Sequence, residues 1–214
     1  MRTEYIYESL LILGLFLYLF NYFRGKATNR AIANKWAEAA QDVFSEQFSV
    51  VGRSDQVGIN EEKNKEPFPL IDQEAAHIFK FYASGRANVK YCMTTLELQR
   101  RQDFLMMFGV GVFFGHKDKV CYEIPFHITN EAPPLCFAVF RKKMESDIME
   151  NYKDIKLMCK KYKVEGVTDK LTIVSDHAEM LAWFFDKQTK DFIRKYEKNI
   201  DIIQVSDRQT FFRT

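Results

Sequence analysis

The sequence predicts an α+β fold, with a single N-terminal transmembrane helix followed by a cytosolic mixed α/β domain of about six or seven strands. Three observations predict it: an uncharged apolar run near the amino terminus, short segments rich in β-branched and aromatic residues, and amphipathic stretches at helical spacing. With 47% hydrophobic residues and only 9 Gly and 5 Pro in 214, the chain has the composition of a packed protein. We assign residues 1–27 to the membrane anchor and its flanks, and residues 28–214 to the domain.

The apolar run extends from Ser9 to Phe20 without a charged side chain. Including its aromatic flanks at residues 5–23, it would form about 28 Å of helix at about 1.5 Å per residue. That length matches the hydrocarbon core of a bilayer. The anchor residues are its large aliphatic and aromatic side chains: Leu10, Leu11, Ile12, Leu13, Leu15, Phe16, Leu17, Leu19 and Phe20.

Two other interpretations of this run remain open. A cleaved signal peptide would need a small-x-small site, and "AIA" at 31–33 has that form, but it lies beyond Arg24, Lys26 and Arg30. A buried core helix is rarely apolar on every face. The pattern therefore favours an uncleaved anchor.

Basic residues predict the orientation of the anchor. Arg2 stands with Glu4 and Glu8 on the amino side, whereas four basic residues follow the span. This positive-inside bias places the body in the cytosol. The four cysteines are widely spaced without a C-x-x-C motif, which favours free thiols in a reducing compartment.

The body alternates between predicted strands and helices. We predict strands at "FSVVG" ending at Gly52 and at 77–85, 88–98, 117–126, 135–140, 171–175 and 200–205. A helix is predicted from Arg30 to Gln47, capped by Asn29, with Ile32, Trp36, Val43 and Phe44 on one face. Another spans about Lys142–Lys163, a third follows a capping box of Asp176 and Glu179, and a further helical stretch runs to Lys198. Residues 53–73 are polar and predict a surface loop.

A second apolar run, at residues 104–114, is too short to cross a bilayer. It is either a buried core helix or an apolar surface for a membrane partner or the bilayer interface. Its large side chains are Phe104, Leu105, Met106, Met107, Phe108, Val110, Val112, Phe113 and Phe114.

Lysines recur at helical spacing within the predicted helix at 142–163. They are Lys153, Lys156, Lys160 and Lys163. Such a run is either a solvated face or a basic stripe that contacts RNA phosphates, for instance of a ribosome, or anionic lipid headgroups.

Catalytic and metal-binding patterns do not emerge from the sequence. The letters "SDH" at 175–177 are adjacent and cannot form a triad of converging side chains. The four histidines are scattered without a metal-ligand spacing. We therefore expect no enzymatic activity, no cofactor and no metal site.

Several short motifs follow one another at characteristic intervals. They are "NYFRGKATNRAIANKW" (21–36) with its N-x-x-I-A-x-x-W pattern, "ASGR" (83–86), "LELQRRQDFL" (96–105) with R-Q-D, "FAVFRKK" (137–143) and "VSD" (205–207). Together they resemble the calumin family of coiled-coil-domain proteins of the endoplasmic reticulum. The resemblance covers most of residues 10–207.

This resemblance implies a single-pass protein of the endoplasmic reticulum membrane with a cytosolic α/β domain. It implies a subunit of the PAT complex, an intramembrane chaperone that assists multipass membrane proteins during synthesis. The implied partners are an Asterix-like small membrane protein, the translocon and other multipass-translocon subunits, the ribosome and nascent multipass proteins. The family also has an acidic lumenal region and a basic coiled coil that reaches the ribosome, and the given sequence, with about nine residues before the span and "RQTFFRT" at its end, shows neither. Whether the coiled coil is absent or not included, and whether there is a calcium-related role, stay open. Without the coiled coil, we expect ribosome contact through the globular body.

Two functions of other classes remain as alternatives. One is a signal-anchored enzyme such as a lumenal transferase, although the absence of an N-x-S/T glycosylation sequence weighs against a lumenal body. The other is a lipid-surface tether that uses the lysines.

Overall fold

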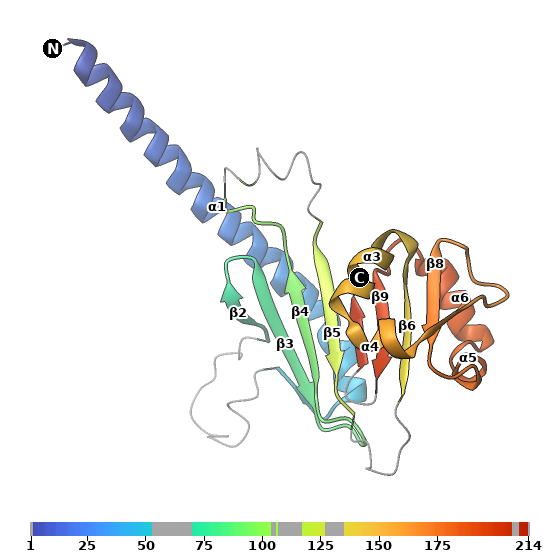
Figure 1. The fold of residues 1–214 in the computed structure, drawn as a ribbon. Helices are drawn as coiled ribbons and strands as arrows, with labels where there is room; N and C mark the ends of the chain where they lie inside the picture. Colours follow the sequence, from blue (N-terminus) through green and yellow to red (C-terminus); the bar gives the residue numbers. More distant parts are fainter. Residues whose placement is uncertain are drawn as a thin grey trace, which may run out of the picture. The chain divides into compact units, whose positions relative to one another are not determined.

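The computed structural model describes residues 2–52, 70–103, 106, 117–126, 135–206 and 210–213 (Figure 1). They form two compact units. The first comprises Met1–Ala83 and Thr95–Lys119, and the second comprises Ser84–Thr94 and Val120–Thr214. The mixed α/β character is confirmed, and the paired strands described below are antiparallel.

Helices and strands follow one another along the described chain. In order they are α1 (Arg2–Gln47), β1 (Val50–Val51), β2 (Asp72–Ala75), β3 (Ile78–Ser84), β4 (Cys92–Glu97), β5 (Lys119–Ile124), β6 (Cys136–Arg141), the 3-10 helix η3 (Lys142–Met144), α3 (Glu145–Asn151), α4 (Lys153–Met158), β7 (Lys160–Tyr162), β8 (Leu171–Ser175), α5 (Glu179–Phe184), α6 (Lys187–Tyr196), β9 (Ile202–Ser206) and β10 (Thr210–Arg213).

Helix α1 is one uninterrupted element that contains both the apolar run and the first segment of the body (Figure 1). The predicted helix start at Asn29 is therefore wrong. Asn29 lies in the middle of α1 and is fully buried, and its side chain bonds to other segments instead of capping a helix end. Of the four residues predicted to share one face, Ile32, Trp36 and Phe44 are partly buried, whereas Val43 is 63% exposed.

The first unit is organised around β3. Strands β1 and β4 flank β3, and β2 also pairs with it, antiparallel and with an irregularity between Gln73 and Ala75. Alternate residues of β3 are buried, as expected for a strand with one covered face. The ring of Phe81 is fully buried and makes edge contacts with Trp36 and Phe44 of α1, with ring centroids 5.5 and 5.1 Å apart. The second half of α1 thus packs on this sheet.

The second unit contains a sheet covered by helices on both faces. Its strand order is β5-β10-β9-β6-β8-β7, and each of these pairs is antiparallel. Side chains of β6 alternate between the faces. Phe137 and Val139 pack with Phe185, at the end of α5, and with Ile193 of α6. The intervening residues of β6 pack on the other face with α3 and α4.

The helix predicted at 142–163 is wrong as a single element. It divides into η3, α3 and α4 and ends in strand β7. The backbone leaves helical geometry at Tyr152 (φ −112°, ψ 87°) and becomes extended at Cys159 (φ −94°, ψ 144°). From Lys160 onwards the chain pairs with β8, so strand hydrogen bonds replace those that would continue the helix.

Each of the seven predicted strands has a counterpart, but β2, β7 and β10 were missed. Residues 53–69 of the predicted loop lie outside the described residues, and residues 72 and 73 begin β2. The predicted capping box is also wrong. The Asp176 carboxylate accepts a hydrogen bond from the Cys136 N–H (2.9 Å), while Ala178 precedes α5.

All four cysteines lie within the described residues, and all are free thiols. Cys92 and Cys136 are buried. Burial raises the pKa of the Cys92 thiol to about 11, which keeps it protonated at neutral pH. The Cys92 thiol is therefore structural rather than reactive.

Candidate functional site

The apolar run of α1 is not covered by the rest of the described chain. Every residue from Tyr5 to Phe20 is exposed, including all nine predicted anchor residues. A core helix would be buried, so this alternative is wrong. By length and composition α1 is the one helix among the described residues that could cross a membrane. The span is thus a membrane candidate that projects from the first unit (Figure 1).

Immediately after this segment, α1 contacts the turn that follows β4. Gly25 is buried against this turn. A methyl group at Gly25 would lie 2.4 Å from backbone atoms of Arg101 and Gln102. Glycine is therefore required here because only a residue without a Cβ permits such a close approach. One turn earlier, the Asn21 amide donates to the Arg101 carbonyl (3.5 Å).

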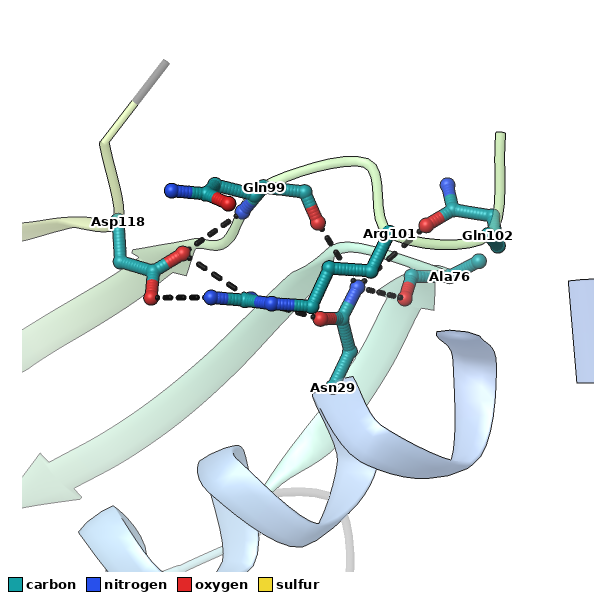
Figure 2. A network of polar contacts seen from close by, with 6 residues as sticks. All are labelled: Asn29, Ala76, Gln99, Arg101, Gln102 and Asp118. Carbon is teal, nitrogen blue, oxygen red and sulfur yellow. Dashed lines mark hydrogen bonds and ion pairs between the residues drawn. The ribbon is translucent and has the colours of Figure 1, made fainter. Parts of the chain in front are cut away.

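One turn beyond Gly25, the fully buried Asn29 joins the helix to two segments of the chain (Figure 2). Its amide nitrogen donates to the carbonyls of Ala76 (3.2 Å) and Gln99 (3.0 Å) and lies 3.4 Å from Gln102 Oε1. Its carbonyl oxygen accepts from Arg101 Nη1 (2.9 Å). Both functional groups of this buried amide are thus satisfied, as the energetics of burial require.

Arg101 extends the network to Asp118, which directly precedes β5. Its guanidinium group makes a two-pronged ion pair with Asp118 (3.1 and 2.8 Å), whose Oδ1 also accepts from the Gln99 N–H (2.8 Å). Partial burial acts to raise the pKa of Asp118, but the hydrogen bonds from Arg101 and Gln99 outweigh it and lower this pKa below its ordinary value. We name the set Gly25, Asn29, Ala76, Gln99, Arg101, Gln102 and Asp118 the helix clamp.

The pKa of Asp118 leads to a pH-dependent prediction. Asp118→Asn should lower the free energy of unfolding by about 1 kcal/mol at pH 7, since the pair is partly exposed. Because the folded pKa lies below the unfolded pKa of about 3.9, this contribution is complete above about pH 5 and is lost as pH falls below the unfolded pKa and through the lower folded pKa. Urea titration at several pH values measures it. Asp191→Asn, at an exposed site on α6, is the control and should change little. A constant difference down to pH 3 would contradict the prediction.

His77 lies at the edge of the helix clamp. Its Nδ1 is 3.5 Å from the Gln102 amide nitrogen. Burial lowers the pKa of His77, and the nearby charge of Arg100 lowers it further, against an opposing effect of Glu97. The ring is therefore neutral at pH 7 and Nδ1 can accept from the amide.

The helix clamp brings together two sequence motifs that lie about seventy residues apart. Asn29 opens the N-x-x-I-A-x-x-W pattern, and Arg101, Gln102 and Asp103 form the R-Q-D motif. Asp103 acts at the far side of the turn, where its carboxylate accepts from the Met106 N–H (3.2 Å). The clamp was not predicted as a site, although these motifs contained three of its members.

The second apolar run begins directly after this turn. Met106 is described and is 37% exposed. The other eight residues predicted for this surface lie outside the described residues.

The four predicted lysines are exposed but do not form a helical stripe. Lys153 and Lys156 lie on α4, Lys160 begins β7 and Lys163 follows it. Within the part of the chain that the structure describes, no cluster of His, Cys, Asp or Glu could hold a metal ion.

These features define a class of protein: a mixed α/β protein with one candidate membrane span among its described residues, whose helix continues into the first unit and is clamped there. A family model described as PAT complex subunit CCDC47 matches residues 4–211. The chain therefore belongs to this family, which confirms the resemblance drawn from the motifs.

Curated relatives agree with the family match. The chain is 25% identical over 212 residues to PAT complex subunit CCDC47 of Danio rerio, covering 96% of this chain and 42% of the relative. It is also 25% identical to the Homo sapiens protein of the same name, over 96% of this chain and 42% of the relative. An uncharacterised protein of Arabidopsis thaliana is 27% identical, covering 97% and 44%. The chain thus spans about two fifths of the length of these relatives.

Proposed function

We propose that this protein is a non-enzymatic subunit of a PAT-like intramembrane chaperone complex in the endoplasmic reticulum membrane. The complex assists the biogenesis of multipass membrane proteins beside the ribosome and translocon. The observation that carries the proposal is the family match over residues 4–211, which includes the span, the helix clamp and both units.

The geometry of the first unit supports a positioning role. The candidate span and the packed part of α1 are one helix, and the helix clamp fixes it to the turn at 99–103 a few residues after the apolar run ends. At about 1.5 Å per residue, Gly25 lies about 8 Å along the axis from Phe20. The span and the first unit therefore hold a defined position relative to each other.

The partners follow from the family and from the position of the apolar segments. An Asterix-like small membrane protein is the proposed partner of the span and of residues 104–114, because this apolar run follows the clamped turn directly. The translocon, the ribosome and nascent multipass proteins are the further proposed contacts, with the body in the cytosol. The basic residues after the span support this orientation.

Affinity purification tests the proposal. Tagged full-length chain, purified from native membranes in mild detergent, should recover a small Asterix-like membrane protein together with translocon subunits. A control chain in which the nine anchor residues are replaced by those of an unrelated span should stay in the membrane but recover less of the small partner. Recovery of neither partner by the native chain would overturn the assignment.

A further inference from the structure

Helix α4 presents large apolar side chains to solvent. Leu157 is 81% exposed and Met158 is 52% exposed. The packing of Ile155 fixes the orientation of α4, because this side chain is fully buried in a cluster that includes Ala138 and Phe140 of β6. At 100° per residue, Leu157 lies about 200° around the helix from Ile155 and so points away from the sheet.

Lysines surround this apolar tip. Lys153 lies one turn before Leu157 on the same face, Lys156 is its neighbour, and Lys160 follows the helix; all three are exposed. Within the described part of the chain none of them makes an ion pair, whereas Lys161 is held by Glu145. Asp154 is the one acidic residue on α4. The tip is therefore apolar at its centre and positively charged around it.

This combination is complementary to an anionic bilayer surface, where negative headgroups lie above hydrocarbon. Lysines gain attraction from the headgroups, and the Leu and Met side chains leave water for the acyl boundary. RNA would attract the same lysines, but it gains nothing from an exposed leucine, because base stacking uses aromatic and guanidinium groups. Protein interfaces are usually depleted in lysine.

The candidate span provides a second, independent argument for lipid as the occupant. A body tethered to a bilayer by its own chain meets that bilayer at a high effective concentration, so a weak second contact becomes significant. We propose that the tip of α4, formed by Leu157 and Met158 with Lys153, Lys156 and Lys160, docks on the anionic leaflet that faces the body. This inference requires the span but not the assignment to a PAT-like complex.

Site-specific crosslinking to lipid tests the proposal on the full chain in proteoliposomes. The photoreactive residue p-benzoylphenylalanine replaces Leu157, and the vesicles contain a clickable phosphatidylcholine with or without phosphatidylserine. The matched control carries the same group in place of Trp183 of α5, which is 86% exposed. The residue one turn before Trp183 is the acidic Glu179, whereas the residue one turn before Leu157 is a lysine. Lipid adducts should form severalfold more at position 157 than at 183, and only with phosphatidylserine present.

The triple change Lys153→Gln, Lys156→Gln and Lys160→Gln supplies the charge test. Each lysine near an anionic surface changes membrane affinity roughly fivefold, so adduct formation at 157 should fall severalfold, and added salt should have the same effect. Equal adducts at 157 and 183, or adducts unaffected by phosphatidylserine, would overturn the proposal. Crosslinking at 157 to ribosomal RNA in preference to lipid, when ribosomes are added, would also overturn it.

Discussion

Gly25→Ala should destabilise the first unit by about 3 kcal/mol or more. The added methyl group would lie 2.4 Å from the backbone of Arg101 and Gln102, and backbone atoms cannot move aside as a flexible side chain can. The helix and the turn would have to separate, which lengthens the hydrogen bonds of Asn29 on the next turn. Overpacking alone costs about 1–3 kcal/mol, and the weakened polar network adds to it.

Urea titration in mild detergent measures this loss. Trp36 packs on Phe81 in the first unit, so its fluorescence reports unfolding there when Trp183 is replaced by Phe. Gly14→Ala is the matched control, because a methyl group at Gly14 meets nothing within 4 Å. This control should be neutral or slightly stabilising, since alanine is the better helix former. Equal stability of the two variants would show that the close approach at Gly25 does not exist.

Asn29→Asp should destabilise the same unit by about 3 kcal/mol. The substitution keeps the shape of the side chain but replaces the amide donor with a carboxylate oxygen. That oxygen would face the carbonyls of Ala76 and Gln99, which the amide now satisfies at 3.2 and 3.0 Å. A buried charge against two carbonyl oxygens is costly, and the ion pair gained with Arg101 offsets only part of this cost.

Asn34→Asp provides the matched control for this prediction, because Asn34 lies on the same helix and is exposed. It should change the free energy of unfolding by less than about 0.5 kcal/mol. Trypsin cleavage after Arg100 and Arg101 gives a second measurement. It should accelerate in Asn29→Asp, where the turn loses its contacts with α1, and stay unchanged in Asn34→Asp. An Asn29→Asp protein as stable and as protected as the native one would refute the role of the helix clamp.

Local patterns in the sequence predicted much of the fold. The strands at 78–84, 136–141 and 171–175 carry dense β-branched and aromatic residues, so their positions were recognised within a residue or two. Strand β7 was missed because Lys160–Tyr162 continues the periodicity of the preceding helix, and only its pairing with β8 makes it a strand. Tertiary pairing of this kind leaves no trace in a short window of sequence.

The helix clamp was out of reach for a related reason. An asparagine after an apolar helical run is most simply explained as a helix cap, and Asn29 was assigned that role. Its true partners, at 76, 99 and 101, lie from 47 to 72 residues away. The motifs containing Asn29 and Arg101 were recognised, but nothing in either motif states that they touch.

The continuity of α1 has a mechanical consequence. A span that meets a thicker or thinner bilayer adjusts by tilting. In a chain with a flexible joint after the span, that tilt would end at the joint. Here helix α1 continues to Gln47, about 40 Å beyond Phe20. A 10° tilt of the span would therefore move the far end of α1 by about 7 Å. The sheet of the first unit, which packs on α1, would move with the helix. A change in bilayer thickness would thus displace this sheet on the aqueous side of the membrane.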